Sequence, residues 1–339
     1  MVESATPRAM IRAMVQGARP PRPLLLPVVF SLGARLENVP LRAFLSNPTK
    51  IASALRQLRG ALALDGVVCY FDPYLEVEAL GGEVQWHADG ASRTLQPSST
   101  DLDTLRERVS SAGEIVQLGR IPVACEVVRR LKVMLPGEPA LAVSVSGPRA
   151  LAAQLMGEAP AGGTVFDEAG FDQIAESAAE LAVALCKSFL DAGANVIFLR
   201  EEIGAIPDPQ RWVDLLNPIV NVIRFYEALP VLLPANPAGG PIPAAASEAC
   251  EGLICPGTID LSAGTLLPQM AALHSAYLPI QELLLPGAND AALLTLLQTL
   301  PPDRGLSLLT TPNDIAADAD IKRLTSLFKS VRDVSRAVA

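Results

Sequence analysis

The sequence predicts a (β/α)8 TIM barrel with a β-hairpin excursion after the second strand. Short apolar segments alternate with helical segments about eight times along the chain, which is typical of a parallel barrel. Half of the 339 residues are hydrophobic, but only 4 % are aromatic and 19 % are charged. This composition is expected for buried parallel strands covered by helices rich in Ala and Leu. A doubly wound open sheet is the structural alternative.

The predicted elements follow one another in a regular order from a helix at residues 6–17, which has Pro7 just inside its start. Strands are expected at 24–32, 66–71, 140–147, 195–199, 230–236, 252–257, 280–287 and 305–314. Helices are expected at 48–60, 101–111, 121–135, 167–192, 212–229, 244–250, 266–276, 289–300 and 318–331. Residues 81–95 read as a hairpin that turns at Asp89-Gly90. We therefore expect one domain over residues 1–339, with the barrel at about 24–335.

The net charge, the apolar runs and the cysteines limit the classes of partner and the cellular compartment. A formal net charge of −9 disfavours nucleic acid and anionic membrane surfaces. The N-terminus carries charges and prolines where a signal peptide needs an apolar core, and no apolar run approaches the roughly 18 residues of a membrane span. The five cysteines are scattered, which indicates reduced thiols and a cytoplasmic protein.

Polar side chains at the predicted strand ends are the candidate site residues, because catalytic groups of TIM barrels lie at the carboxyl ends of the strands. Asp72 directly follows the buried second strand and is the candidate catalytic residue. The candidate substrate-binding residues are Arg35, Tyr74, Ser146, Arg200, Glu201 and Asn236. Two of the candidate site residues also have simpler interpretations. Asp72 could only cap the next helix, and Glu201 could belong to a solvated rim in which it pairs with Arg200. His87 lies in the hairpin and could act only if the hairpin folds over the mouth.

Four motifs carry a family resemblance: "CYFDPYLEVEALGG", "LAVSVSGPRALAAQLMGE", "DAGANVIFLREEIG" and "RGLSLLTTPNDIAADADIKRL". In this order they resemble landmarks of the uroporphyrinogen decarboxylase (URO-D) superfamily, from about residue 20 to 331. The superfamily includes the decarboxylase of porphyrin biosynthesis, methyltransferases that use corrinoid proteins, and cobalamin-independent methionine synthase. The resemblance implies a TIM barrel in which Asp72 accepts hydrogen bonds from substrate pyrrole N–H groups and Arg35 binds substrate carboxylates.

The chain departs from both branches of the superfamily. Ser31 and Leu32 stand where the decarboxylases have an Arg-Gln pair, and the tyrosine of the helix after strand three and the histidine of the closing loop are missing. The zinc ligands of the methyltransferase branch are missing after strand five, where the sequence reads "VLLPANPAGG". No metal site is therefore expected.

Three functions remain open. The first is a URO-D-like decarboxylase of diverged specificity, a lyase that acts on a tetrapyrrole-like or other small organic substrate in the barrel mouth and needs no cofactor. The second is a corrinoid-dependent methyltransferase component without the usual zinc, whose partner would be a corrinoid protein, and zinc is the metal to test there. The third is a non-catalytic ligand-binding barrel. A homodimer is considered for each.

Overall fold

The computed structural model describes residues 5–88, 93–96, 104, 107–109, 112–156, 168–202, 208–235, 251–263, 265–267, 275–285, 288, 290–299 and 306–337. The strands within them are β1 (Leu24–Leu25), β2 (Gly66–Tyr70), β3 (Val84–Trp86), β4 (Arg93–Leu95), β5 (Ala140–Ser146), β6 (Val196–Glu201), β7 (Leu229–Pro234), β8 (Gly257–Asp260), β9 (Thr265–Leu267), β10 (Ser275–Tyr277) and β11 (Leu308–Thr310).

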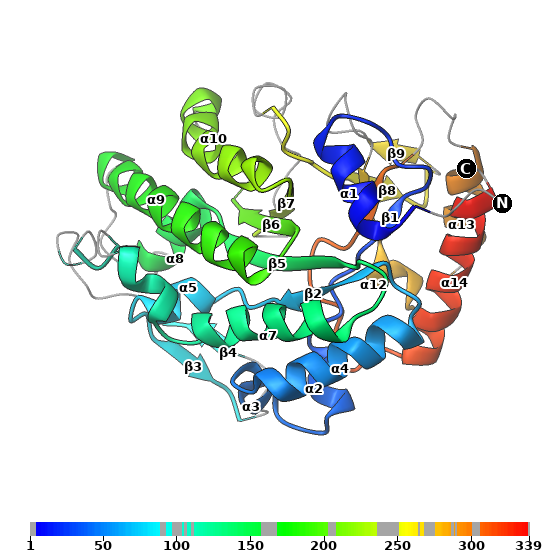
Figure 1. Cartoon of the computed structure of the whole chain (residues 1–339), viewed down its shortest axis with the longest axis horizontal. Coiled ribbons are helices and arrows are strands. Elements are labelled where there is room, and N and C mark those ends of the chain that lie inside the picture. Colours follow the sequence, from blue (N-terminus) through cyan, green and yellow to red (C-terminus); the bar gives the residue numbers. More distant parts are fainter. Residues whose placement is uncertain are drawn as a thin grey trace.

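The helices come between these strands. They are α1 (Pro7–Val15), α2 (Leu32–Leu36), α3 (Leu41–Leu45), α4 (Pro48–Ala61), α5 (Leu75–Ala79), the 3-10 helix η1 (Ala112–Gln117), α7 (Ile121–Met134), α8 (Pro148–Met156), α9 (Glu168–Ala192), α10 (Pro209–Phe225), α12 (Ile280–Leu283), α13 (Asp290–Thr299) and α14 (Ile321–Ala337). Helices α4, α7, α9 and α10 lie outside the central strands, and α14 continues this outer layer at the right of the view (Figure 1).

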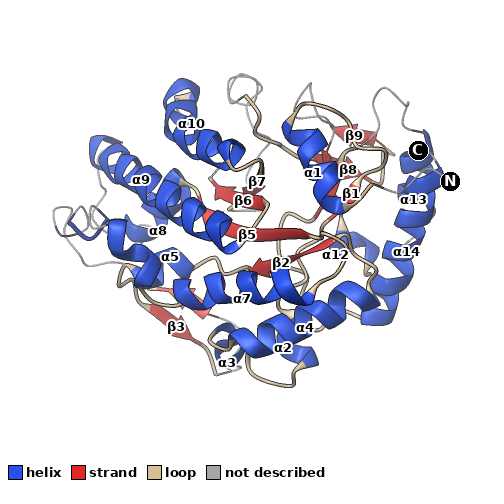
Figure 2. Cartoon of the chain, viewed as in Figure 1, coloured by secondary structure: helices blue, strands red, loops and turns tan. Residues whose placement is uncertain are grey.

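The strands form a (β/α)8 barrel from two mainly parallel sheets, in the orders β2-β5-β6-β7 and β1-β11-β10-β8-β9. A parallel bridge between Val231 and Ile254 joins β7 to the segment before β8. At the other seam, the amide of Asp65 donates to the carbonyl of Leu25 over 3.3 Å. The barrel strands, such as β2, β5, β6 and β7, thus lie inside the layer of helices, whereas the hairpin strand β3 lies at the edge, as Figure 2 shows. The predicted fold class is confirmed.

Helix α1 covers the amino-terminal ends of the strands. Thr6 caps the helix by accepting a hydrogen bond from the amide of Ala9, and its hydroxyl also donates to Glu138, just before β5. Arg12 pairs with Glu227, just before β7, at 3.4 Å. Because α1 lies over this end of the barrel with its apolar face buried, the carboxyl ends of the strands form the mouth.

The hairpin excursion is present and antiparallel. Strand β3 pairs with β4 so that Trp86 lies opposite Arg93. The turn predicted at Asp89-Gly90 lies outside the described residues, as do most of the helix expected at 101–111 and all of that expected at 244–250.

The prediction for the seventh strand is wrong. Residues 280–287 begin as α12, and the barrel strand at this place is β10, in a segment that was expected to be helical. Ile280 and Leu283 are buried, and their spacing puts them on one face of a helical turn. A short apolar run fits a buried strand or a buried helix equally well, so its periodicity could not separate the two.

Gly66 makes the close contact between β2 and β5. A methyl group at this position would lie 2.0 Å from the carbonyl oxygen of Ala140, which is backbone and cannot turn away. We expect Gly66→Ala to lower the free energy of unfolding by about 2 kcal/mol or more, as overpacking does. Gly60, in α4, has open space around it, so Gly60→Ala should instead stabilise the chain by up to about 1 kcal/mol. Urea unfolding of both variants measures this, and a Gly66→Ala variant as stable as Gly60→Ala would contradict the observed strand contact.

Candidate active site

The carboxyl ends of β2, β5 and β6 bring three of the predicted site residues together. Strand β2 pairs with β5, and Ser146 of β5 lies opposite Arg200 of β6 in parallel register. Asp72 follows β2 at the same end, and all three side chains are buried. This is the position at which barrels of this class carry their reactive groups.

Asp72 lies between two arginines that come from different parts of the chain. Its Oδ1 is 2.7 Å from Nη2 of Arg93 in the hairpin, and its Oδ2 is 2.5 Å from Nη1 of Arg120, just before α7. The amide of Tyr74 also donates to Oδ1 over 3.0 Å. The Asp72 side chain is 0 % exposed, so this carboxylate is fully enclosed by its partners.

Arg120 connects the carboxylate to the surrounding structure. Its Nη2 pairs with Glu78 of α5 at 2.6 Å, and its Nη1 donates to the hydroxyl of Tyr70 over 3.2 Å. The Tyr70 hydroxyl in turn donates to the carbonyl of Leu45 over 2.7 Å. One guanidinium therefore ties together the end of β2, α5 and the end of α3.

Arg93 contacts two aromatic rings in addition to its ion pair with Asp72. Its guanidinium carbon lies 4.9 Å from the ring centre of Trp86 and 5.2 Å from that of Tyr74. Arginine stacks well on aromatic rings while its edge remains available for a carboxylate. The hairpin is thus fastened to the barrel mouth through Arg93 and Asp72.

The two arginines keep Asp72 ionised. Burial on its own would raise the pKa of Asp72, but the charges of Arg93 and Arg120 outweigh this effect, and the pKa lies below its usual value. Asp72 is therefore a fixed negative charge at neutral pH and is unsuited to act as a proton donor there.

A second buried carboxylate, Glu76, lies beside the cluster. Its Oε1 and Oε2 accept hydrogen bonds from the amide and the hydroxyl of Ser146 over 3.0 and 2.9 Å. Burial raises the pKa of Glu76, although these hydrogen bonds and the charge of Arg200 oppose the shift. Both the amide and the hydroxyl of Ser146 are thus used as hydrogen-bond donors to Glu76.

Arg200 is buried at the end of β6, with 5 % of its surface exposed. Its guanidinium carbon lies 5.6 Å from the ring centre of Phe71, and Nη2 makes one long contact, 3.5 Å, with the carbonyl of Ala235. Burial lowers the pKa of Arg200, while the charges of Glu76 and Asp72 oppose the shift.

Glu201 points to the helix layer and caps α8. Its carboxylate accepts hydrogen bonds from the amides of Ala150, Glu202 and Arg149 over 2.8, 2.8 and 3.3 Å. Gly147 makes this possible, since a methyl group there would lie 2.5 Å from Oε2 of Glu201. The interpretation of Glu201 as a solvated, exposed rim residue does not hold, because the residue is 0 % exposed.

The remaining predicted residues lie apart or at the edge. Arg35 is exposed and donates to the carbonyl of Ala319 over 2.9 Å, which joins the first loop to the segment before α14. Tyr74 is half-buried under Arg93. In the hairpin, Nε2 of the exposed His87 lies 2.6 Å from Oγ1 of Thr94. Asn236 lies outside the described residues.

Sequence reasoning missed Arg93 and Arg120 as site residues. A signal existed for Arg93, because hairpin alternation places it opposite Trp86 and hence on the same face. Nothing in the pattern around Arg120 distinguishes it from an ordinary arginine before a helix.

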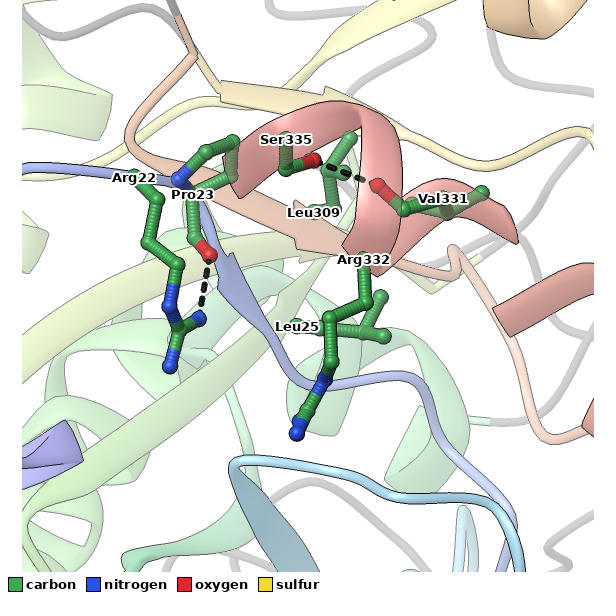
Figure 3. Close-up of a pocket in the computed structure, with 7 residues that line it drawn as sticks. All are labelled: Arg22, Pro23, Leu25, Leu309, Val331, Arg332 and Ser335. Carbon is green, nitrogen blue, oxygen red and sulfur yellow. Dashed lines mark hydrogen bonds between the residues drawn. The ribbon is translucent and has the colours of Figure 1, made fainter. Parts of the chain in front are cut away.

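The opposite end of β2 has a similar ion cluster. Asp65 precedes β2, is 3 % exposed, and pairs with Arg22 at 2.7 Å and Arg332 at 3.1 Å. Beside it, Arg22, Leu25 and Arg332 help line a pocket of about 10 Å³, which Figure 3 shows between β1, β11 and α14. This volume has room for about one water molecule, so the pocket is too small for an organic substrate.

The described part of the chain contains no group of three or more His, Cys, Asp or Glu side chains arranged to hold a metal ion. None of its helices is long and apolar enough to cross a membrane.

The strand order and the helix layer make the chain a (β/α)8-barrel protein, and the comparison of its sequence with family models gives the family. Residues 6–232 match the uroporphyrinogen decarboxylase (URO-D) family model. The chain therefore belongs to the URO-D family. No curated protein sequence matches the chain.

Solved structures resemble the chain over nearly its whole length. A methyltransferase from Methanosarcina mazei is 15 % identical, with 97 % of this chain and 98 % of that chain covered and a TM-score of 0.74. The homocysteine methyltransferase MmuM from Escherichia coli is 12 % identical over 95 % and 99 % of the chains, with a TM-score of 0.44. A B12-independent methionine synthase from Shewanella is 11 % identical over 83 % and 87 %, with a TM-score of 0.39. At such identities, the similarity to the first structure establishes the fold.

The Glu201 cap makes the stability of the chain depend on pH. Burial raises the pKa of Glu201 from 4.5 to about 7, so its stabilising contribution is complete below pH 4.5 and is lost as the pH rises through 7. Since Gln does not titrate, the stability advantage of the native chain over Glu201→Gln should shrink between pH 4.5 and 8 by on the order of 3 kcal/mol. Urea unfolding at both pH values measures this change. An advantage that stays constant or grows with pH would contradict the raised pKa.

Proposed function

We propose that the chain is a URO-D-family enzyme of diverged specificity that binds a small organic, tetrapyrrole-like substrate at the barrel mouth and decarboxylates it. The observation that supports this function is the enclosed, ionised carboxylate of Asp72 at the end of β2. In the proposed role, Asp72 accepts a hydrogen bond from a substrate N–H group.

The hydrogen bonds of Asp72 leave room for that role. An ionised carboxylate has about four acceptor positions. Arg93 and the amide of Tyr74 use two of them on Oδ1, and Arg120 uses one on Oδ2. One acceptor position therefore remains on Oδ2 for a donor from the substrate. Because the side chain is fully enclosed, the substrate must shift a neighbour to reach it, and Arg93 belongs to the hairpin at the edge.

The fixed charge suits the proposed reaction. Protonation of a pyrrole ring carbon gives a cation, the bond to the carboxylate carbon then breaks, and its electron pair returns to the ring as carbon dioxide leaves. The net change replaces a C–COO⁻ group by C–H and takes up one proton. A carboxylate already oriented in a site with little water stabilises the cation at no further cost of reorganisation. Asp72 supplies the charge, and Arg93 and Arg120 hold it in place.

Methyl transfer is the second candidate. The observation that favours it is the whole-length similarity to the methyltransferase from Methanosarcina mazei. The partners in this case are a methyl-corrinoid protein and a thiol. The described residues offer no cluster of zinc ligands, so no step through zinc is derived. Methylcobalamin and a thiol, with and without added zinc, test this function through the change in the corrinoid absorption spectrum.

Two matched variants test the proposed role of Asp72. Asp72→Asn and Asp65→Asn each remove the charge of a buried aspartate that lies between two arginines, at opposite ends of β2. We expect Asp72→Asn to reduce carbon dioxide release from uroporphyrinogen, or from a related porphyrinogen, by about tenfold or more, since a charge-assisted hydrogen bond contributes about 1.5–3 kcal/mol. Asp65→Asn should lower stability and leave the rate per folded molecule unchanged.

Mass spectrometry of the products, together with urea unfolding of each variant, provides the measurement. Undiminished turnover in Asp72→Asn would remove Asp72 from the mechanism. An equal loss in both variants would show that the effect comes from the fold. If the chain binds porphyrinogen but no decarboxylated product is formed, the chain is a ligand-binding protein and the proposed reaction is wrong.

A further inference from the structure

Arg200 is a buried cation whose donors are poorly used. The only hydrogen bond described for its guanidinium is the long contact to the carbonyl of Ala235, and its Nε has no partner among the described residues. A buried guanidinium with unused donors costs free energy unless another acceptor is supplied. Phe71 covers one side of the group but accepts no strong hydrogen bond.

Arg93 has an unused donor in the same neighbourhood. Its side chain is 8 % exposed, its Nη2 is taken by Asp72, and its Nη1 has no partner in the described part of the chain. The stacking on Trp86 and Tyr74 fixes the plane of this guanidinium. The direction of the free donor is therefore fixed before any ligand arrives.

The two arginines share neighbours. Asp72 is the ion-pair partner of Arg93, and its charge also acts on Arg200. Tyr74 stacks on Arg93 and likewise interacts electrostatically with Arg200. One guanidinium comes from the hairpin and the other from β6, and they lie over the rings of Tyr74 and Phe71, the residues on either side of Asp72 and Pro73.

Two of the carboxylates whose charges act on Arg200, those of Asp72 and Glu76, have other hydrogen-bond partners. Both oxygens of Asp72 are engaged by Arg93 and Arg120, and both oxygens of Glu76 are engaged by Ser146. Neither carboxylate completes the hydrogen bonds of Arg200. Nε of Arg200 is thus left without an acceptor among the described contacts.

We propose that Nε of Arg200 and Nη1 of Arg93 form an oxyanion-binding site that takes a carboxylate or phosphate group of the ligand. Guanidinium groups bind both kinds of oxyanion through charge-assisted hydrogen bonds. This inference rests on the proposed function, because the same ligand places its N–H group on Asp72. It adds that the substrate carries a second, non-reacting anionic group held by arginines of the hairpin and β6.

Small anions test the site without any turnover. Succinate and inorganic phosphate are the probes, succinamide is the neutral control, and ionic strength is held constant with chloride during isothermal titration. We expect saturable binding of at least one anion to the native chain and none of succinamide. Preference for succinate or for phosphate tells which oxyanion the site selects.

Three variants locate the site. Arg200→Met and Arg93→Gln should each weaken binding of the preferred anion by about tenfold or more. Arg22→Gln, at the opposite end of the barrel, should leave it unchanged, because Arg332 still pairs with Asp65 there. If Arg200→Met does not fold, the comparison of Arg93→Gln with Arg22→Gln decides the result.

The outcomes separate this site from the proposed reaction. Anion binding that is lost in Arg200→Met or Arg93→Gln supports the site even if no porphyrinogen is decarboxylated. Absence of saturable anion binding to the native chain, or equal binding to the native chain and both site variants, overturns it even if decarboxylation is observed.

Discussion

The ion pairs of Asp72 hold the mouth of this barrel together. Arg93 fastens the hairpin to the end of β2, and Arg120 fastens the start of α7 and, through Glu78, α5. Removing one partner of a buried ion pair leaves an uncompensated charge, which costs about 3–5 kcal/mol. The hairpin, the end of β2, α5 and the start of α7 are therefore held together as one unit at the mouth.

Strand β2 has a buried aspartate next to each of its two ends, and we assign different roles to the two. Asp65 and Asp72 are both buried and both lie between two arginines. Around Asp65, the backbone amide of Leu25 provides a further donor, and α1 covers this end of the barrel. Around Asp72, the amide of Tyr74 is the backbone donor, and the hairpin lies against this end through Arg93. Position in the barrel, and not residue type, separates a structural carboxylate from a candidate catalytic one.

The barrel could be predicted from the sequence because buried parallel strands and amphipathic helices produce a regular alternation of apolar and amphipathic segments along the chain. The sequence also selected Asp72 as a candidate, because a carboxylate at the end of an apolar strand is unusual, and the structure shows that Asp72 is buried there. The sequence could not predict the pairing with Arg120, since this depends on how segments 48 residues apart meet in space. The role of Glu201 as the cap of α8 likewise required the register of β5 and β6, and β10 was missed because its segment is too short for a clear period.

A double-mutant cycle of Asp72→Asn and Arg93→Gln tests most directly whether this ion pair fastens the hairpin to the mouth. The free energy of unfolding of the native chain, both single variants and the double variant gives their coupling. We expect a coupling of about 1 kcal/mol or more, because the pair is buried. The distant pair Asp72→Asn and Arg22→Gln should be additive within about 0.5 kcal/mol. A coupling between Asp72 and Arg93 no larger than that of the distant pair would contradict the structure proposed for the mouth.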